Sequence, residues 1–323
     1  MNFYGTLGMA CAEEETLYQM FRAGMTGARL NLSHTNLKES GGLLNCFRAA
    51  AERAAVEPNL VLDLRGPELR VGKLAEPAVL TEGTDVTLGA GGIPVPEAAI
   101  QCAQPGREIS LDDSALLLKV REQGRDTLRC QVVRGGVLKS RKSLAILGVE
   151  PDTPALTAED LEDLDQVGRW GVTHILQPFV RGAEDLLTVR QALDRRGLAR
   201  VKIMAKIENR TGLDKLDEII AGADEVCIAR GDLGNSMPLW QLPRVQKDIA
   251  ERCRAAGRPF CLVTQLLWSM EQRPVPTRAE VLDIYNGVLD GAESLMLTGE
   301  TAAGRYPVQA MDYLVRTAGT ALE

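Results

Sequence analysis

Short apolar runs rich in β-branched residues or leucine recur along the chain and predict buried strands. Eight of them can be counted, near residues 2–7, 27–32, 59–64, 173–178, 201–207, 225–230, 259–264 and 293–298. The runs are nearly continuous and do not alternate with polar positions, which is typical of parallel strands buried on both faces.

Segments with the apolar period of an amphipathic helix separate most of these runs. They cover residues 13–24, 43–55, 158–171, 183–197, 213–223, 242–257, 277–292 and 307–322. Several end in glycine, which often stops a helix because it tolerates a left-handed backbone. A strand followed by a helix, eight times over, predicts an α/β fold, the (β/α)8 TIM barrel.

The third connection breaks this rhythm between about Val71 and Glu150. The helix period disappears there, and short alternating runs are bounded by turn residues. We therefore expect a small all-β domain over residues 71–150, inserted after the third strand, and a barrel formed by residues 1–70 and 151–323. Active sites of such barrels lie at the carboxyl ends of the strands, so the insert is interpreted as a lid. A module without a functional role is the alternative.

Composition excludes several functional classes. With 323 residues, of which 45% are hydrophobic, the chain can bury a large core. A net charge of −7 without long basic runs argues against binding nucleic acid or an anionic membrane through overall charge. The N-terminus lacks a signal sequence, and no apolar run is long enough to span a membrane. The seven cysteines form no CxxC pair and predict free thiols in a reducing cytoplasm.

Charged residues stand at the ends of two neighbouring predicted strands. Lys206 and Glu208 follow one apolar run, and Asp232 follows the next. In a parallel barrel these strand ends lie side by side. Two carboxylates and an ammonium together predict a divalent-metal site for an anionic substrate. Arg29, at the end of another strand, can grip a phosphate as a bidentate fork.

Longer motifs allow a comparison with a known family. In order along the chain stand GTLGMACAEEETLYQMFRAGMTGARLNLSH, VLDLRGPELRVG, ISLDDS, KIMAKIENRTGLDKLDEII, IARGDLG, TQLLWSM and PVPTRAEVLDIYNGVLDGAESLMLTGETAAGRYP. Together they resemble the pyruvate kinase family from about Thr6 to Pro307. The resemblance implies a barrel with a β lid and the transfer of phosphate from phosphoenolpyruvate to ADP, yielding pyruvate and ATP.

The resemblance also assigns roles to residues of the substrate side. Glu208 and Asp232 match the family's ligands for Mg2+ or Mn2+. Lys206 matches the lysine that contacts the transferring phosphoryl group and the forming enolate, and Thr264 matches a threonine on the enolate side, in the proton path. The backbone of the stretch that begins a short helix would receive the substrate carboxylate; its residues are Ala229, Arg230, Gly231 and Asp232.

Further matches concern the second cation and the nucleotide. The family's K+ site corresponds to Asn31, Ser33, Asp63 and the carbonyl of Leu64. Glu68 bears on the same site, because relatives that work without K+ tend to carry a lysine at this place. The residues that match groups near the nucleotide phosphates are His34, Arg70 and Lys142. For His34, a hydrogen-bonding role within its loop is an alternative.

Departures from the family pattern gather on the nucleotide side. Met9 stands where a proline helps to pack the adenine, and Arg65 replaces a lysine. The lid hinge differs at Ser143, Ala145 and Leu147. Two other functions therefore stay open: a lyase of enolate chemistry on the same barrel, and a non-catalytic paralogue that binds phosphoenolpyruvate. Since the family's C-terminal effector domain has no counterpart before Glu323, we expect a monomer or homodimer without that effector site.

Overall fold

The computed structural model describes residues 1–112, 115–149 and 153–323. By its internal contacts the chain divides into two compact units. One consists of Met1–Gly66 and Ala155–Glu323, and the other of Pro67–Pro154. The first is called the barrel unit below and the second the insert unit.

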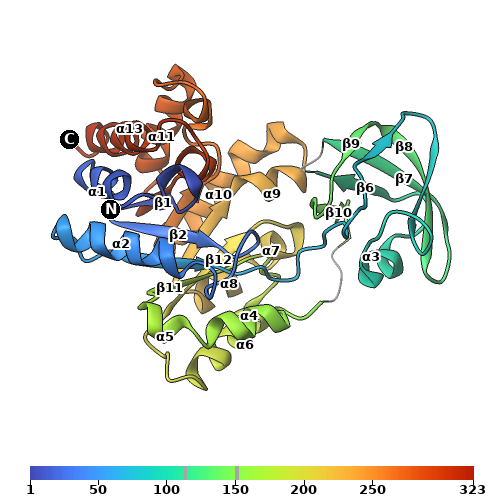
Figure 1. Ribbon diagram of the computed structural model, residues 1–323, viewed down its shortest axis with the longest axis horizontal. Helices are drawn as coiled ribbons and strands as arrows, with labels where there is room; N and C mark the ends of the chain where they lie inside the picture. The colour runs from blue at the N-terminus through green and yellow to red at the C-terminus, as the bar shows by residue number, and fades with distance from the viewer. Residues whose placement is uncertain (113–114, 150–152) are drawn as a thin grey trace. The chain divides into compact units, whose positions relative to one another are not determined.

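The predicted barrel is confirmed, because eight parallel strands close into one sheet (Figure 1). Around the barrel the order is β1-β15-β14-β13-β12-β11-β3-β2. Their bounds are β1 Asn2–Thr6, β2 Gly27–Asn31, β3 Asn59–Asp63, β11 His174–Gln177, β12 Lys202–Ile207, β13 Glu225–Ala229, β14 Phe260–Val263 and β15 Ser294–Met296. Every strand coincides with one of the apolar runs recognised in the sequence.

Helices follow the strands of this unit, as the sequence predicts. The α-helices are α1 Glu14–Arg22, α2 Gly41–Arg53, α4 Ala158–Leu164, α5 Val167–Trp170, α6 Ala183–Asp194, α7 Arg210–Asp214, α8 Leu216–Gly222, α9 Arg230–Asn235, α10 Leu242–Ala255, α11 Arg278–Leu289, α12 Gly299–Ala302 and α13 Pro307–Thr320. Three 3-10 turns are also present: η1 Met9–Cys11, η2 Leu239–Gln241 and η3 Trp268–Glu271. The segments expected as single helices over 158–171 and 213–223 are each divided into two short ones.

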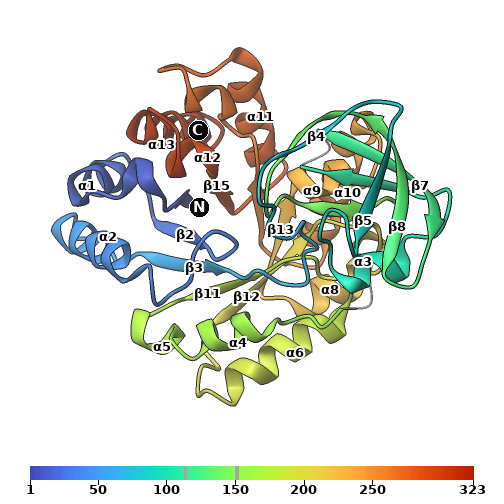
Figure 2. The same cartoon turned by 45° about the vertical axis from the view of Figure 1, so that its right-hand side comes forward.

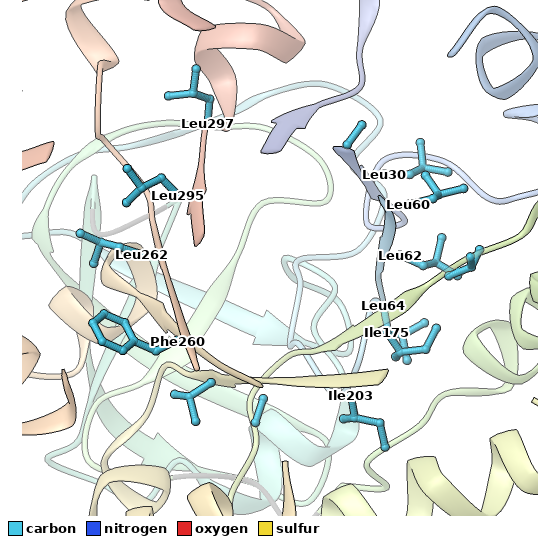
Figure 3. Packing of buried hydrophobic residues seen from close by; sticks show 14 of the residues in the cluster. Leu30, Leu60, Leu62, Leu64, Ile175, Ile203, Phe260, Leu262, Leu295 and Leu297 are labelled. Atoms are coloured by element: carbon cyan, nitrogen blue, oxygen red, sulfur yellow. The ribbon is translucent and has the colours of Figure 1, made fainter. Parts of the chain in front are cut away.

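Alternation along the strands divides the barrel core into two parts. One set of side chains faces the helices; Figure 3 shows Leu60, Leu62, Ile175 and Phe260 among those that point outward from the ring of strands. The opposite set fills the interior with Tyr4, Val61, Leu176, Met204, Cys227, Ala229, Cys261, Val263 and Met296. Because strand side chains alternate, inward-facing positions nearer the carboxyl ends lie just beyond this apolar filling. Arg29, Asp63 and Lys206 occupy such positions, and Glu208 follows directly after β12.

The insert unit contains two antiparallel sheets (Figure 2). The larger has the order β10-β6-β7-β8-β5, and the smaller pairs β4 with β9. Their bounds are β4 Ala78–Leu80, β5 Asp85–Gly89, β6 Glu108–Leu111, β7 Leu116–Gln123, β8 Thr127–Arg134, β9 Gly136–Leu138 and β10 Leu144–Ile146.

Two details of the predicted insert need correction. The unit is not all-β, because α3 (Glu97–Cys102) follows Pro96 and buries Ala99 and Ile100 in the unit's own core. The unit also starts at Pro67 rather than at residue 71, because Leu69 already packs in that core. Its predicted end at 150–151 lies outside the described residues. None of the described helices combines the length and apolar character needed to cross a membrane.

Candidate active site

A cluster of charged side chains occupies the carboxyl ends of β2, β3 and β12. Lys206 Nζ lies 2.9 Å from Glu208 Oε1 and 3.5 Å from Asp63 Oδ1. Both carboxylates are buried, with Glu208 3% and Asp63 1% exposed. Carboxylates are rarely buried to this extent without a charged partner. Lys206 is therefore the cation that these two buried acids share.

Arg29 enters the same cluster through Asp63. Its Nε donates to Asp63 Oδ2 at 2.8 Å, and a second guanidinium nitrogen contacts the same oxygen. Its third nitrogen donates to Thr6 Oγ1 at 3.1 Å, and the Thr6 hydroxyl donates to the carbonyl of Leu297 at 2.8 Å. No pattern along the chain predicts this role of Thr6. The Arg29 guanidinium is thus oriented before any ligand binds.

Electrostatics fix the charge of Lys206. Burial alone would lower the pKa of its ammonium, but the neighbouring Asp63 and Glu208 carboxylates raise it, and the net pKa lies above its ordinary value. Lys206 is therefore a permanent cation at neutral pH, which is the state that stabilises negative charge on a bound group.

For Glu208 the effect of burial on the pKa outweighs that of the neighbouring ammonium. Burial, the largest influence, raises its pKa to about 7, although Lys206 lowers it; Asp232 raises it further. Its second oxygen accepts a hydrogen bond from the backbone N–H of Phe179 at 2.9 Å. Phe179 has a φ of 51°, an uncommon value for a large side chain. The turn after β11 is therefore held in a strained form that points this amide at Glu208.

Asp232 lies in the first turn of α9, directly after β13. Its charge raises the pKa values of both Lys206 and Glu208, so Asp232 lies near the cluster. Among the described residues, no group of three or more His, Cys, Asp or Glu side chains is assembled for a metal ion. Two carboxylates completed by water and substrate oxygens are, however, a ligand set that Mg2+ accepts. Glu208 and Asp232 fit that arrangement.

The residues expected to hold a monovalent cation also come together. Asn31 and Asp63 are register partners at the ends of β2 and β3, and the Ser33 amide donates to Asn31 Oδ1 at 3.0 Å. Asp63 Oδ1 is buried and accepts no hydrogen bond from the described residues. Its charged neighbour is the Lys206 ammonium at 3.5 Å, beyond the length of a good hydrogen bond, so this buried oxygen keeps the capacity to bind a cation. The chemistry of this set, all oxygen with one carboxylate, fits K+.

Thr264 follows β14 in a strained conformation, with a φ of 78° that is rare for a β-branched residue. The Arg230 guanidinium donates to the Thr264 carbonyl at 2.6 and 3.2 Å and pairs with Asp283 at 2.6 Å. A Cβ at Gly231 would lie 3.3 Å from Thr264 Cγ2. The Arg230 side chain is therefore committed to holding Thr264, which leaves only its backbone for a ligand.

The three residues assigned to the nucleotide are not united in one unit. His34 is exposed in the barrel unit, whereas Arg70 and Lys142 belong to the insert unit. There Arg70 pairs with Glu68 at 2.7 Å and Lys142 pairs with Asp112 at 2.7 Å. Met9, expected near the nucleotide, is 90% exposed.

Comparisons with known proteins agree on one family. A family model described as the barrel domain of pyruvate kinase matches residues 2–311. The chain is 38% identical over 319 residues to a pyruvate kinase of Aeropyrum pernix, covering 98% of this chain and 69% of that protein. It is 36% identical to one of Geobacillus stearothermophilus, covering 95% of this chain and 54% of the relative. The chain thus spans about half the length of that bacterial protein.

Solved structures give the same result. A crystal structure of a pyruvate kinase from Cryptosporidium parvum superposes with a TM-score of 0.92 at 30% identity. The superposition covers 99% of this chain and 68% of that one.

Proposed function

Because the chain belongs to the pyruvate kinase family, we propose that it transfers phosphate from phosphoenolpyruvate to ADP, giving pyruvate and ATP. The observation that carries this proposal is the buried cluster of Lys206, Asp63 and Glu208, with Arg29 held beside it. A cation fixed between strand ends stabilises charge that develops during phosphoryl transfer, and this is the main task of such an enzyme.

Two kinds of metal ion fit the residues present. Glu208 and Asp232 would hold Mg2+ or Mn2+, which neutralises phosphate charge and orients the substrate. Asn31, Ser33, Asp63 and the Leu64 carbonyl would hold K+. Asp63 Oδ1, which is buried and accepts no hydrogen bond from the described residues, supports this assignment.

The remaining groups have separate tasks in the proposed reaction. Arg29 binds the phosphate as a preoriented fork, and Lys206 stabilises the phosphoryl group and the enolate oxygen. The backbone from Ala229 to Asp232 receives the substrate carboxylate. The hydroxyl of Thr264 hydrogen-bonds the enolate side and passes a proton to it, and the strained backbone of this residue supports a functional role.

We assign His34, Arg70 and Lys142 to the nucleotide phosphates. Because Arg70 and Lys142 already carry carboxylate partners, the nucleotide phosphates would compete with Glu68 and Asp112 for these cations. We also place the protein in the cytoplasm, which the seven free cysteines support.

A coupled assay tests this function. Purified protein is given phosphoenolpyruvate, Mg2+ and K+ together with a panel of nucleoside diphosphates, and pyruvate and nucleoside triphosphate are both measured. We expect equal amounts of the two products, with ADP accepted. Pyruvate formed without any nucleotide would indicate the lyase alternative. Binding of phosphoenolpyruvate without turnover would indicate the non-catalytic paralogue. The relatives named pyruvate kinase favour phosphotransfer over both.

A further inference from the structure

Two acidic side chains of α4 are buried, although the sequence pattern there is that of an acidic, solvent-facing helix start. Asp160 is 0% and Asp163 5% exposed. Asp160 caps its own helix through Thr157, and its carboxylate also accepts the backbone N–H groups of Arg65 at 2.8 Å and Gly66 at 3.1 Å. Asp163 accepts the backbone N–H of Leu37 at 2.8 Å. These donors belong to the loops that follow β2 and β3.

The side chain of Arg65 completes a bridge between the two loops. One guanidinium nitrogen donates to Asp163 Oδ2 at 2.6 Å, and another donates to the carbonyl of Thr35 at 2.6 Å. Asp163 thus contacts both loops, directly at Leu37 and through Arg65. The partners are 126 and 98 residues apart in the chain. All of these contacts lie within the barrel unit.

The same two loops carry part of the proposed K+ site. Ladder pairing between β2 and β3 ends at Asn31 and Asp63, which fixes those two residues. Ser33 and the carbonyl of Leu64 lie beyond the paired residues. Ser33 is two residues from Thr35, and Leu64 is adjacent to Arg65. The Leu64 amide still donates to the carbonyl of Leu176 in β11 at 3.1 Å, and the Ser33 amide donates to Asn31 Oδ1 at 3.0 Å. Beyond these anchors, the Asp163–Arg65 pair holds Arg65 and Thr35, so it adds contacts that the barrel ladder does not supply.

We propose that Asp163 and Arg65 are positioning residues that hold the loops after β2 and β3 together and thereby set the affinity of the monovalent-cation site. The proposal rests on the cation site assigned under the proposed function. Hydroxyl and carbonyl oxygens bind a monovalent ion only when several converge, so a loop shift weakens binding. Replacing a hydrogen-bonding group behind the ligands typically lowers metal affinity 10- to 100-fold.

Three variants test the proposal. Asp163→Asn retains an acceptor for the Leu37 amide but presents an NH2 group toward the Arg65 guanidinium. Arg65→Lys, which places the family's residue at this position, replaces the planar fork by one ammonium and so removes the two separate nitrogens that now serve Asp163 and the Thr35 carbonyl. Asp165→Asn is the matched control, because Asp165 lies at the end of the same helix and pairs with Arg196 at 2.7 Å, with its side chain 59% exposed.

Binding and exchange are measured without turnover. Titration with Tl+, a K+ analogue observable by 205Tl NMR, gives the affinity of the cation site. Hydrogen exchange of the ligand-free protein reports on the amides of residues 32–40. We expect Asp163→Asn to weaken Tl+ binding about tenfold or more and to speed exchange at Leu37. Arg65→Lys should have a smaller effect in the same direction, and Asp165→Asn should match the wild type.

Kinetics then separate positioning from a general loss of structure. In the phosphotransfer assay, Asp163→Asn should raise the half-saturating K+ concentration about tenfold while leaving kcat at saturating K+ close to that of the wild type. A folded Asp163→Asn protein with unchanged Tl+ affinity would overturn the proposal. Lower kcat and stability without a change in K+ dependence would overturn it as well. If Asp163→Asn does not fold, Arg65→Lys provides the same comparison.

Failure of the proposed phosphotransfer activity can be distinguished from failure of the positioning role. A wild-type protein that binds Tl+ but transfers no phosphate would refute the proposed activity, and the Tl+ titrations would still decide the positioning role. A wild-type protein that does not bind Tl+ would overturn the cation site and this inference together.

Discussion

Replacing Lys206 by methionine tests both the chemistry and the energetics of the active-site cluster. Methionine keeps much of the length and apolar volume of the side chain but removes the ammonium. Loss of one preorganised charge at a reacting group lowers kcat by roughly 100- to 1,000-fold. We therefore expect Lys206→Met to reduce phosphotransfer by at least about 100-fold at saturating substrate.

The structure adds a stability effect that the sequence alone does not predict, since a lysine at a strand tip would be expected to affect folding little. Lys206 Nζ lies 2.9 Å from Glu208 and 3.5 Å from Asp63, and both carboxylates are buried. Breaking a buried ion pair typically costs about 3–5 kcal/mol because a charge is left uncompensated. Lys206 also lowers the pKa of Glu208, so its removal raises that pKa further above the ordinary value.

Lys202→Met is the matched control, because Lys202 lies on the same strand but is exposed. Both variants are compared with the wild type by initial rates and by denaturant unfolding. We expect Lys202→Met to keep activity and stability, and Lys206→Met to lose both. Turnover of Lys206→Met within tenfold of the wild type would refute its role in catalysis. An unfolding free energy equal to that of Lys202→Met would refute the ion network.

Three other predictions concern K+, pH and substrate binding. Activity should require K+ as well as Mg2+. Glu68→Lys should reduce the K+ requirement, because the introduced ammonium supplies a positive charge. Full wild-type activity with tetramethylammonium as the only monovalent cation would contradict this prediction. Burial lowers the pKa of His174 to about 4 in the folded protein, against about 6.5 in the unfolded chain. Between these pH values the unfolded chain binds one more proton than the folded protein, so the free energy of unfolding falls as the pH drops from 6.5 to 4. The loss should amount to roughly 3 kcal/mol and be absent from His174→Gln when unfolding is measured across this range. Thr6→Val removes the hydroxyl that orients Arg29. The KM for phosphoenolpyruvate should then rise about tenfold, which is the effect of losing one hydrogen bond to a charged group. An unchanged KM would show that Asp63 alone orients the guanidinium.

The strand pattern was sufficient to predict the barrel and the location of its charged ends. Parallel strands buried on both faces must be apolar, and this requirement left eight recognisable runs whose bounds agree with the structure. Lys206 and Glu208 could be found because each is a charged residue at the end of such a run, whereas Asp63 was predicted only from the family resemblance. Periodicity was less informative in the insert, where the six-residue helix α3 was missed.

Tertiary structure alone decided how the cluster is supported. Asp160 and Asp163 stand in a segment whose acidic pattern predicts exposure, and they are buried because the loops after β2 and β3 pack over α4. Thr6 and the amide of Phe179 serve Arg29 and Glu208 through hydrogen bonds between different strand ends. Local sequence sets strand and helix preference through neighbouring residues. Partners that lie about a hundred residues apart meet only once the barrel has closed, and for that reason their pairing leaves no pattern along the chain.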